Sequence, residues 1–177
     1  NSFFIGLIAT FIATTLGTLA ALGLSRPHMP YKGLIMAILI SPMIVPLIIT
    51  AAGMFFFYAR INLVYSFTGI ILAHVALATP FVVITVTATL VGFDMNMVKA
   101  AQSLGARPVR TFFKVIMPLI LPGVISGALF AFITSFDEVV IVMFMGSLDQ
   151  LTIPKQMWAG IRQEISPVIL CMATCLV

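Results

Sequence analysis

Long apolar segments separated by short polar stretches dominate this sequence. An α-helix rises 1.5 Å per residue, so about 20 apolar residues cross a hydrocarbon core of about 30 Å. The pattern predicts membrane-spanning helices over about 2–24, 34–58, 67–91 and 119–139, and a fifth over 166–177 that is truncated. We therefore expect an all-α fold, a polytopic transmembrane helical bundle.

Small residues in the first and fourth segments predict close helix contacts. Ala13, Gly17 and Ala21 recur every four residues in the first segment, and Gly123 and Gly127 have the same spacing in the fourth. A strip of small residues lets the backbones of two transmembrane helices approach each other. These two segments are therefore expected to pack tightly against neighbours.

The second and third segments contain residues that are unusual inside a membrane helix. Pro42 and Pro46 each remove an amide donor, so we expect the second segment to be kinked or opened near its middle. Such a break either flanks a substrate path or is a packing kink. His74 lies within the third segment, where we favour a neutral histidine bonded to a neighbouring helix over a functional ionisable group.

The stretch 93–118 lies between the third and fourth segments and is unusually basic. Gly105 provides a helix stop, because a left-handed backbone costs glycine little. Pro108 moves Arg107 away from helical geometry and suits the first turn of a second helix, expected to end near residue 116. The stretch predicts a bent helical pair that is either a solvated connection or a docking element. It holds four of the nine basic residues: Lys99, Arg107, Arg110 and Lys114.

The distribution of charge predicts how the chain is oriented. The first and third gaps between segments hold six basic residues, and the second and fourth hold three, so the positive-inside rule places the first and third gaps in the cytoplasm. The six are Arg26, Lys32, Lys99, Arg107, Arg110 and Lys114, and the three are Arg60, Lys155 and Arg162.

Composition excludes several classes of protein. The chain is 62% hydrophobic and 8% charged, whereas soluble domains carry about 25% charged residues. The formal charge of +4 is dispersed, which argues against nucleic-acid binding. Cys171 and Cys175 have no histidine or further cysteine to complete a metal set, so we expect them to pack. Without a G-x-x-x-x-G-K-[ST] loop or an activated nucleophile, we expect no enzyme activity, metal or cofactor.

The basic stretch K-A-A-Q-S-L-G-A-R-P-V-R-T-F-F-K-V-I-M-P resembles the EAA signature of the membrane subunits of binding-protein-dependent ABC importers. That signature is Glu-Ala-Ala, three residues, Gly, nine residues, Ile, one residue and Leu-Pro. Lys99 stands where the family usually has Glu, so a contact of that acid is not assumed here. The matching residues are Ala100, Ala101, Gly105 and Pro118, with Val115 and Met117 as close substitutes.

The resemblance covers essentially the whole chain and implies a type I ABC importer permease in the bacterial inner membrane. It implies a separate cytoplasmic ATPase, a second permease subunit, an extracytoplasmic solute-binding protein, and one further crossing before Asn1. The flanking sequences D-M-N-M-V-K-A-A-Q-S-L-G and P-G-V-I-S-G-A-L-F-A-F-I-T-S-F-D-E are similar to the spermidine/putrescine branch. The residues expected to couple to the ATPase are Lys99, Ala100, Ala101, Gly105, Ala106, Arg107, Pro108 and Pro118.

Asp137 and Glu138 are the candidate substrate residues, and they are expected near the outer membrane face. Polyamines carry several ammonium groups, which carboxylates and aromatic walls such as Phe136 and Trp158 suit by charge and cation–π attraction. The alternative is that one of the acids only caps or pairs at a helix end. An outer loop over 140–165, with a short amphipathic helix at about 155–162, is expected to follow.

Two other readings of the function stay open. A permease of the same class can carry another solute, such as opines, amino acids or iron chelates. A membrane enzyme or a non-transporting scaffold would have to use His74, Asp137 and Glu138, and no spacing supports that.

Overall fold

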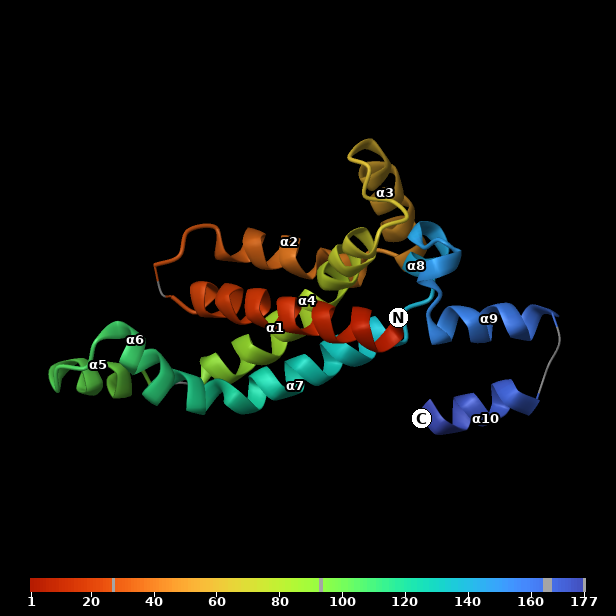
Figure 1. Ribbon diagram of the computed structural model, residues 1–177. Coiled ribbons are helices and arrows are strands. Elements are labelled where there is room, and N and C mark those ends of the chain that lie inside the picture. Colours follow the sequence, from red (N-terminus) through yellow and green to blue (C-terminus); the bar gives the residue numbers. More distant parts are fainter. Residues whose placement is uncertain (27, 93, 164–166, 177) are drawn as a thin grey trace.

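The computed structural model describes residues 1–26, 28–92, 94–163 and 167–176, and their regular structure is entirely helical. Three long apolar helices form the bundle: α1 (Ser2–Leu24), α4 (Phe67–Val91) and α7 (Met117–Phe136). Figure 1 shows them side by side, with α5 and α6 at one end of the bundle and α8 and α9 at the other. The helix α4 is the most buried of the three, because it packs against both α1 and α7.

Glycines allow the three helices to approach closely, as the strips of small residues predict. A Cβ atom at Gly17 of α1 would lie 2.6 Å from Cβ of Val82 in α4. A Cβ atom at Gly127 of α7 would lie 3.0 Å from Cα of Val82 and 2.5 Å from Oγ1 of Thr85. Real atoms cannot come so close, so α4 is held between two glycine faces that larger residues would push apart.

The second predicted segment is broken more severely than a kink. It consists of α2 (Lys32–Ile44) and α3 (Leu47–Arg60), which are bent by 104° at the break. Val45 precedes Pro46 and has the extended backbone (φ −71°, ψ 135°) that a following proline favours. The expectation that the segment over 34–58 is kinked or opened near its middle agrees with this break, and of the two possibilities the segment is opened, because Pro46 follows the end of the first helix.

The fourth segment begins earlier and ends earlier than predicted. Pro108 to Phe136 is one continuous apolar helix, in which α6 (Pro108–Thr111) and a π-helical turn, η1 (Phe112–Ile116), lead into α7. The amide of Met117 bonds to the carbonyl of Phe112, and this wide turn accommodates Pro118, which has no amide hydrogen to donate. The part of this helix named α7, Met117–Phe136, lies within three residues of the predicted limits of about 119 and 139, but the continuous helix starts 11 residues before 119, at Pro108.

The described helices bear out a membrane protein. Three are long and apolar enough to cross a bilayer, Ser2–Leu24, Phe67–Val91 and Pro108–Phe136, or four if the bent pair α2 and α3 is one span. The last helix, α10 (Pro167–Leu176), has 10 described residues, fewer than a crossing needs. The all-helical transmembrane fold class is confirmed.

Short helices fill the two ends of the bundle. At one end α5 (Met95–Ser103) precedes the continuous helix. At the other end the predicted outer loop contains α8 (Val140–Met145), the 3-10 turn η2 (Leu148–Gln150) and α9 (Ile153–Gln163). The side-chain amide of Asn1 donates to the carbonyls of Asp149 and Leu151 at 2.9 and 3.0 Å, so the start of α1 is fastened to this end.

Candidate functional site

The basic stretch forms a bent connection, here called the elbow (residues 94–114), whose bend is set by Gly105. Asp94 is the N-cap of α5, and its side chain accepts from the amide of Asn96 at 2.9 Å. At its end the amide of Ala106 donates to the carbonyl of Ala101 at 3.0 Å, and that of Gly105 to Gln102 at 2.9 Å. These two bonds, with φ +80° at Gly105, make a Schellman C-cap, which needs a left-handed residue at this position.

The second arm of the elbow starts at Arg107. This residue is extended (φ −66°, ψ 153°) and Pro108 occupies the first turn of the helix. The amide and the hydroxyl of Thr111 both donate to the carbonyl of Arg107, at 2.9 and 3.2 Å. Thr111 is buried, and these two bonds satisfy its amide and its hydroxyl, so the second arm packs against the bundle without an unpaired donor at this residue.

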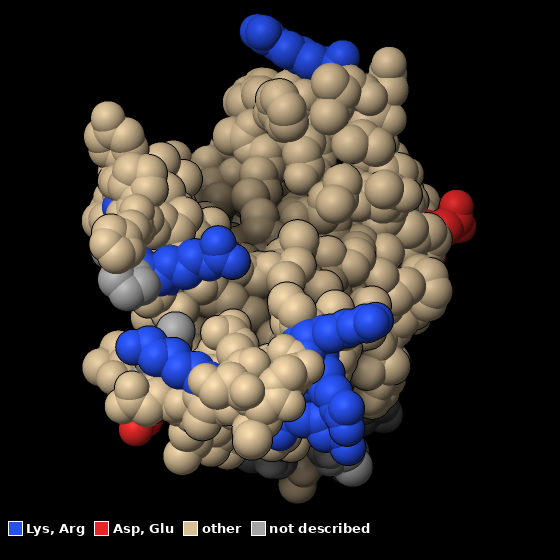
Figure 2. All heavy atoms as spheres, turned by 90° about the vertical axis from the view of Figure 1, so that its left-hand side faces the viewer, with Lys and Arg blue, Asp and Glu red and all other residues tan. Residues whose placement is uncertain are grey.

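The outer surface of the elbow mixes basic and apolar side chains. Leu104 is 88% exposed, and Val109 and Phe113 are 69% and 63% exposed. Figure 2 looks onto this end of the molecule and shows several Lys and Arg side chains spread over it, with uncharged residues between them. Of the predicted coupling residues, Ala101 and Ala106 are half-buried, and the exposed ones are Lys99, Ala100, Gly105, Arg107, Pro108 and Pro118. Pro118 lies in α7, away from the bend.

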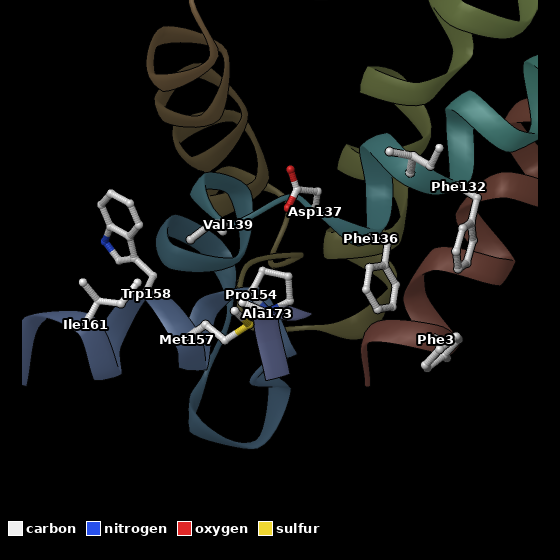
Figure 3. Close-up of a pocket in the computed structure, with 11 residues that line it drawn as sticks. Phe3, Phe132, Phe136, Asp137, Val139, Pro154, Met157, Trp158, Ile161 and Ala173 are labelled. Carbon is white, nitrogen blue, oxygen red and sulfur yellow. The ribbon is translucent and has the colours of Figure 1, made fainter. Parts of the chain in front are cut away.

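At the opposite end, Asp137 and Glu138 are neighbours in sequence that line different cavities. Asp137 is the exposed C-cap of α7 and lines a cavity of about 690 Å³, here called the aromatic cavity. Figure 3 shows its carboxylate with Phe132, Phe136 and Trp158 around the same cavity. The rings of Phe132 and Phe136 stack with centroids 5.5 Å apart, and Phe3 of α1 meets Phe136 edge-on at 5.1 Å. Three of the four predicted substrate residues thus share one cavity.

Glu138 faces the other way and is buried. Its Oε1 accepts from the amide of Ile141 at 2.9 Å, which caps the start of α8. Burial raises the pKa of the Glu138 carboxyl, although the amides of Ile141 and Val140 act in the opposite direction. The side chain also lines a cavity of about 340 Å³ beside the break between α2 and α3, here called the break cavity. The capping alternative is therefore realised at Glu138, and the shared site predicted for both acids is split.

A lysine holds the other end of α8. Nζ of Lys155, in α9, donates to the carbonyls of Val142 and Gly146 at 3.0 and 3.2 Å. A cation at a helix C-terminus and an anion at its N-terminus both oppose the helix dipole favourably. Burial lowers the pKa of Lys155. This role of Lys155 was not predicted, because nothing local in the sequence pairs Lys155 with a six-residue helix.

His74 links two helices behind the acidic turn. Its Nδ1 lies 2.8 Å from Oγ of Ser135, which joins α4 to α7 two residues before Asp137. The hydrogen bond agrees with the prediction of a histidine bonded to a neighbouring helix. Nε2 of His74 is buried and has no partner within the described part of the chain. The described residues contain no group of three or more metal-ligating side chains that could hold an ion.

Comparisons with known proteins match this arrangement to one family. Residues 13–177 match the family model described as "Binding-protein-dependent transport system inner membrane component". The chain is 31% identical over 177 residues to the spermidine/putrescine transport system permease protein PotC of Haemophilus influenzae, covering all of this chain and 69% of that protein.

Two relatives from Escherichia coli K12 are similarly close. The chain is 32% identical over 168 residues to its spermidine/putrescine permease PotC, covering 95% of this chain and 63% of that protein. It is 30% identical over 174 residues to the putrescine transport system permease protein PotI, covering 94% of this chain and 62% of that protein. The chain thus spans somewhat less than two thirds of these two relatives.

Proposed function

The chain belongs to the family of inner membrane components of binding-protein-dependent transport systems, and from this we propose that it is the permease subunit of an ATP-driven polyamine importer. Family membership and the apolar helices confirm the predicted family and the multi-pass inner-membrane location. The identity of the solute, the separate ATPase and the other subunits of the transporter are what we propose. The observation that supports a polyamine as the solute is the aromatic cavity with Asp137 on its wall.

The elbow is proposed as the contact with a separate cytoplasmic ATPase. A cytoplasmic position for the elbow is supported by the positive-inside rule, because six of the nine basic residues lie in the first and third gaps between the membrane segments and the elbow is the third gap. The exposed apolar side chains of Leu104, Val109 and Phe113 suit a groove on a partner, and the basic side chains around them suit an acidic rim. Because the second arm continues into α7, a push on the elbow moves a transmembrane helix directly.

The aromatic cavity is proposed to receive one end of a polyamine at the outer face. A protonated amine has three N–H donors, which a carboxylate accepts by charge-assisted hydrogen bonds. Aromatic faces within about 6 Å of the cation add to the attraction. Asp137 is exposed on the cavity wall, and Phe132, Phe136 and Trp158 surround the same space. Methylene carbons between the amines find apolar walls there.

The relatives' names support the polyamine assignment, since spermidine/putrescine and putrescine permeases cover nearly all of this chain. We propose that the chain works with ATPase subunits, a second permease subunit and an extracytoplasmic solute-binding protein. The family description itself names a binding-protein-dependent system.

Uptake by the full-length permease, reconstituted with its partner subunits in proteoliposomes, tests the solute. Asp137→Asn should raise the half-saturating concentration of radiolabelled putrescine about tenfold, because a charge-assisted hydrogen bond contributes about 1.5–3 kcal/mol. Asp149→Asn, which changes an exposed acid of η2 outside the cavity, is the matched control. Unlabelled spermidine should compete with putrescine. Uptake that ignores both polyamines would assign the permease to another solute.

A further inference from the structure

The break cavity lies on the other side of the acidic turn from the aromatic cavity. It is lined by residues 42–47 of the break, by Leu77 and Phe81 of α4, and by Thr134 and Glu138. Its volume is about 340 Å³, and none of the residues that line it is basic. A buried carboxyl with no neighbouring cation is either neutral or paired with a positively charged occupant, and a protonated amine in the cavity would favour the charged form.

Backbone oxygens at the break remain without helical donors. Pro46 has no amide hydrogen, so the carbonyl of Pro42 loses its partner, and the end of α2 at Ile44 leaves the carbonyls of Met43 and Ile44 in the same state. Pro42 also has no amide hydrogen to donate to the carbonyl of Ile38. That carbonyl has another donor, because the hydroxyl of Ser41 donates to it at 2.8 Å. The carbonyl oxygens that lack a helical donor therefore belong to residues that line the cavity.

Electrostatics at the break favour a cation. The C-terminus of α2 carries the partial negative charge of the helix dipole, and Glu138 adds a carboxylate that is 7% exposed. The start of α3 is also at the break, and its amides at Ile49 and Thr50 donate to the carbonyl of Pro46 at 2.9 and 3.1 Å, so this carbonyl is not among the free acceptors. Glu138 accepts from the amide of Ile141 at 2.9 Å, a bond that favours the charged carboxylate, and a carboxylate has acceptor sites for further donors besides this one.

We propose that the break cavity is a second amine site, which holds one protonated primary amino group and the methylene carbons next to it. This deepens the proposed function and rests on it. Carbonyl oxygens, the Thr134 hydroxyl and the Glu138 carboxylate supply acceptors for the three donors of an ammonium group. Leu77 and Phe81 supply apolar wall for the carbons, and Phe81 an aromatic face. The space holds about ten water volumes, too large for tight coordination of a bare metal ion.

The position of the second site separates capture from passage. Asp137 lines the outer aromatic cavity, and Glu138, the next residue, lines the break cavity between α2, α3, α4 and α7. An amine captured at Asp137 would then move from the aromatic cavity to the break cavity, where the carboxylate of the next residue, Glu138, receives it. Loss of the Asp137 charge then weakens capture, whereas loss of the Glu138 charge slows the later step.

Transport kinetics in the reconstituted full-length system test this split. Glu138→Gln retains an oxygen that can accept from Ile141, so α8 stays capped while the charge is lost. The maximal rate of putrescine uptake should fall about tenfold, with the half-saturating concentration changed less than twofold. Thr134→Val should lower the rate two- to fivefold and Thr134→Ser should restore it. Wild-type rates in both Glu138→Gln and Thr134→Val would overturn the second site and leave the Asp137 assignment standing.

Thiol labelling gives a readout that does not depend on transport. Ile44 lines the cavity and is 74% exposed, so Ile44→Cys can be placed in a chain with Cys171→Ser and Cys175→Ser. A cationic methanethiosulfonate (2-aminoethyl) should react at least fivefold faster than the neutral methyl reagent, and Glu138→Gln should abolish that preference. Putrescine should protect the thiol, and sodium chloride at equal ionic strength should not. Equal protection by sodium, or no cationic preference, would overturn the amine site.

Discussion

The two ends of this molecule are built by different means. The elbow at one end of the bundle is shaped by backbone rules, since Gly105 is left-handed at φ +80° and Arg107 is extended before Pro108. The acidic turn (Asp137 and Glu138) at the other end is shaped by long-range contacts, since Glu138 caps α8 and lines a cavity with the break at residues 42–47, more than 90 positions earlier in the chain. A substitution that restricts the backbone should therefore abolish the function of the elbow, and a substitution that removes a charge or a helix cap should have a smaller effect at the acidic turn.

Replacing Gly105 should give the largest effect. A β-branched residue is strongly disfavoured at φ +80°, so Gly105→Val should reshape the Schellman C-cap and misplace the second arm of the elbow. We expect uptake to fall more than 100-fold while the subunit remains in the membrane, measured as transport per subunit detected by immunoblot.

Gly92→Val is the matched control for the Gly105 substitution. Gly92 also follows a helix, but its φ is −87° and a Cβ there would meet nothing within 4 Å. Near-normal uptake in Gly92→Val is expected. If Gly105→Val were equally active, the bend would not be what couples this permease to its motor.

Sequence rules were sufficient for the elbow because its geometry is local. A glycine stop and a proline start predict a helix end near 104 and a helix start near 108, and α5 and α6 have those limits within one residue. They failed at Pro118, where the π-helical turn at Phe112–Ile116 keeps the helix continuous. A rule about one proline cannot anticipate a neighbouring turn that widens to accommodate it.

The end that holds the acidic turn was only partly predictable, and the reason is physical. Apolar spacing and the prolines indicate where chains cross and break, and the acids stand out among apolar residues. Whether Asp137 and Glu138 act together depends on which of them caps α8, and that depends on α8 being formed and on Lys155 at its far end. Such contacts are set by the packed bundle, so residue types alone left the choice between substrate contact and cap open.

Reversing the charge of the second arm should have the next largest effect. Arg107→Glu places an acid on the exposed elbow, where an acidic rim of the proposed ATPase would repel it. We expect the affinity for the ATPase to fall about tenfold, measured by co-purification at graded salt concentrations. Lys32→Glu, an exposed change at the same end outside the elbow, should leave retention unchanged. Equal losses in both variants would indicate a general effect of charge, without a specific docking surface.

Removing the lysine that caps α8 should have a moderate effect on stability. Lys155→Met keeps the length of the side chain and loses the bonds to the carbonyls of Val142 and Gly146. The free energy of unfolding should fall by about 1 kcal/mol, or about 2–4 °C in the midpoint of thermal unfolding in detergent. Lys32→Met is the control, since Lys32 is exposed at the opposite end. An unchanged midpoint would mean that α8 does not need its C-terminal cap.

The smallest effect is a pH dependence that belongs to Glu138. Burial raises its pKa above the value of an unfolded chain, so between the two pKa values the folded protein binds more protons than the unfolded one. The free energy of unfolding contributed by this group therefore falls as pH rises through the folded pKa, and recovers as pH falls toward the unfolded pKa. The contribution of Glu138 is measured by comparing the thermal unfolding of wild type and Glu138→Gln at pH 5 and pH 7.5, since Gln cannot titrate. Wild type should lose stability relative to the variant as pH rises. A parallel pH dependence in the two proteins would contradict a raised pKa of Glu138 in the folded protein.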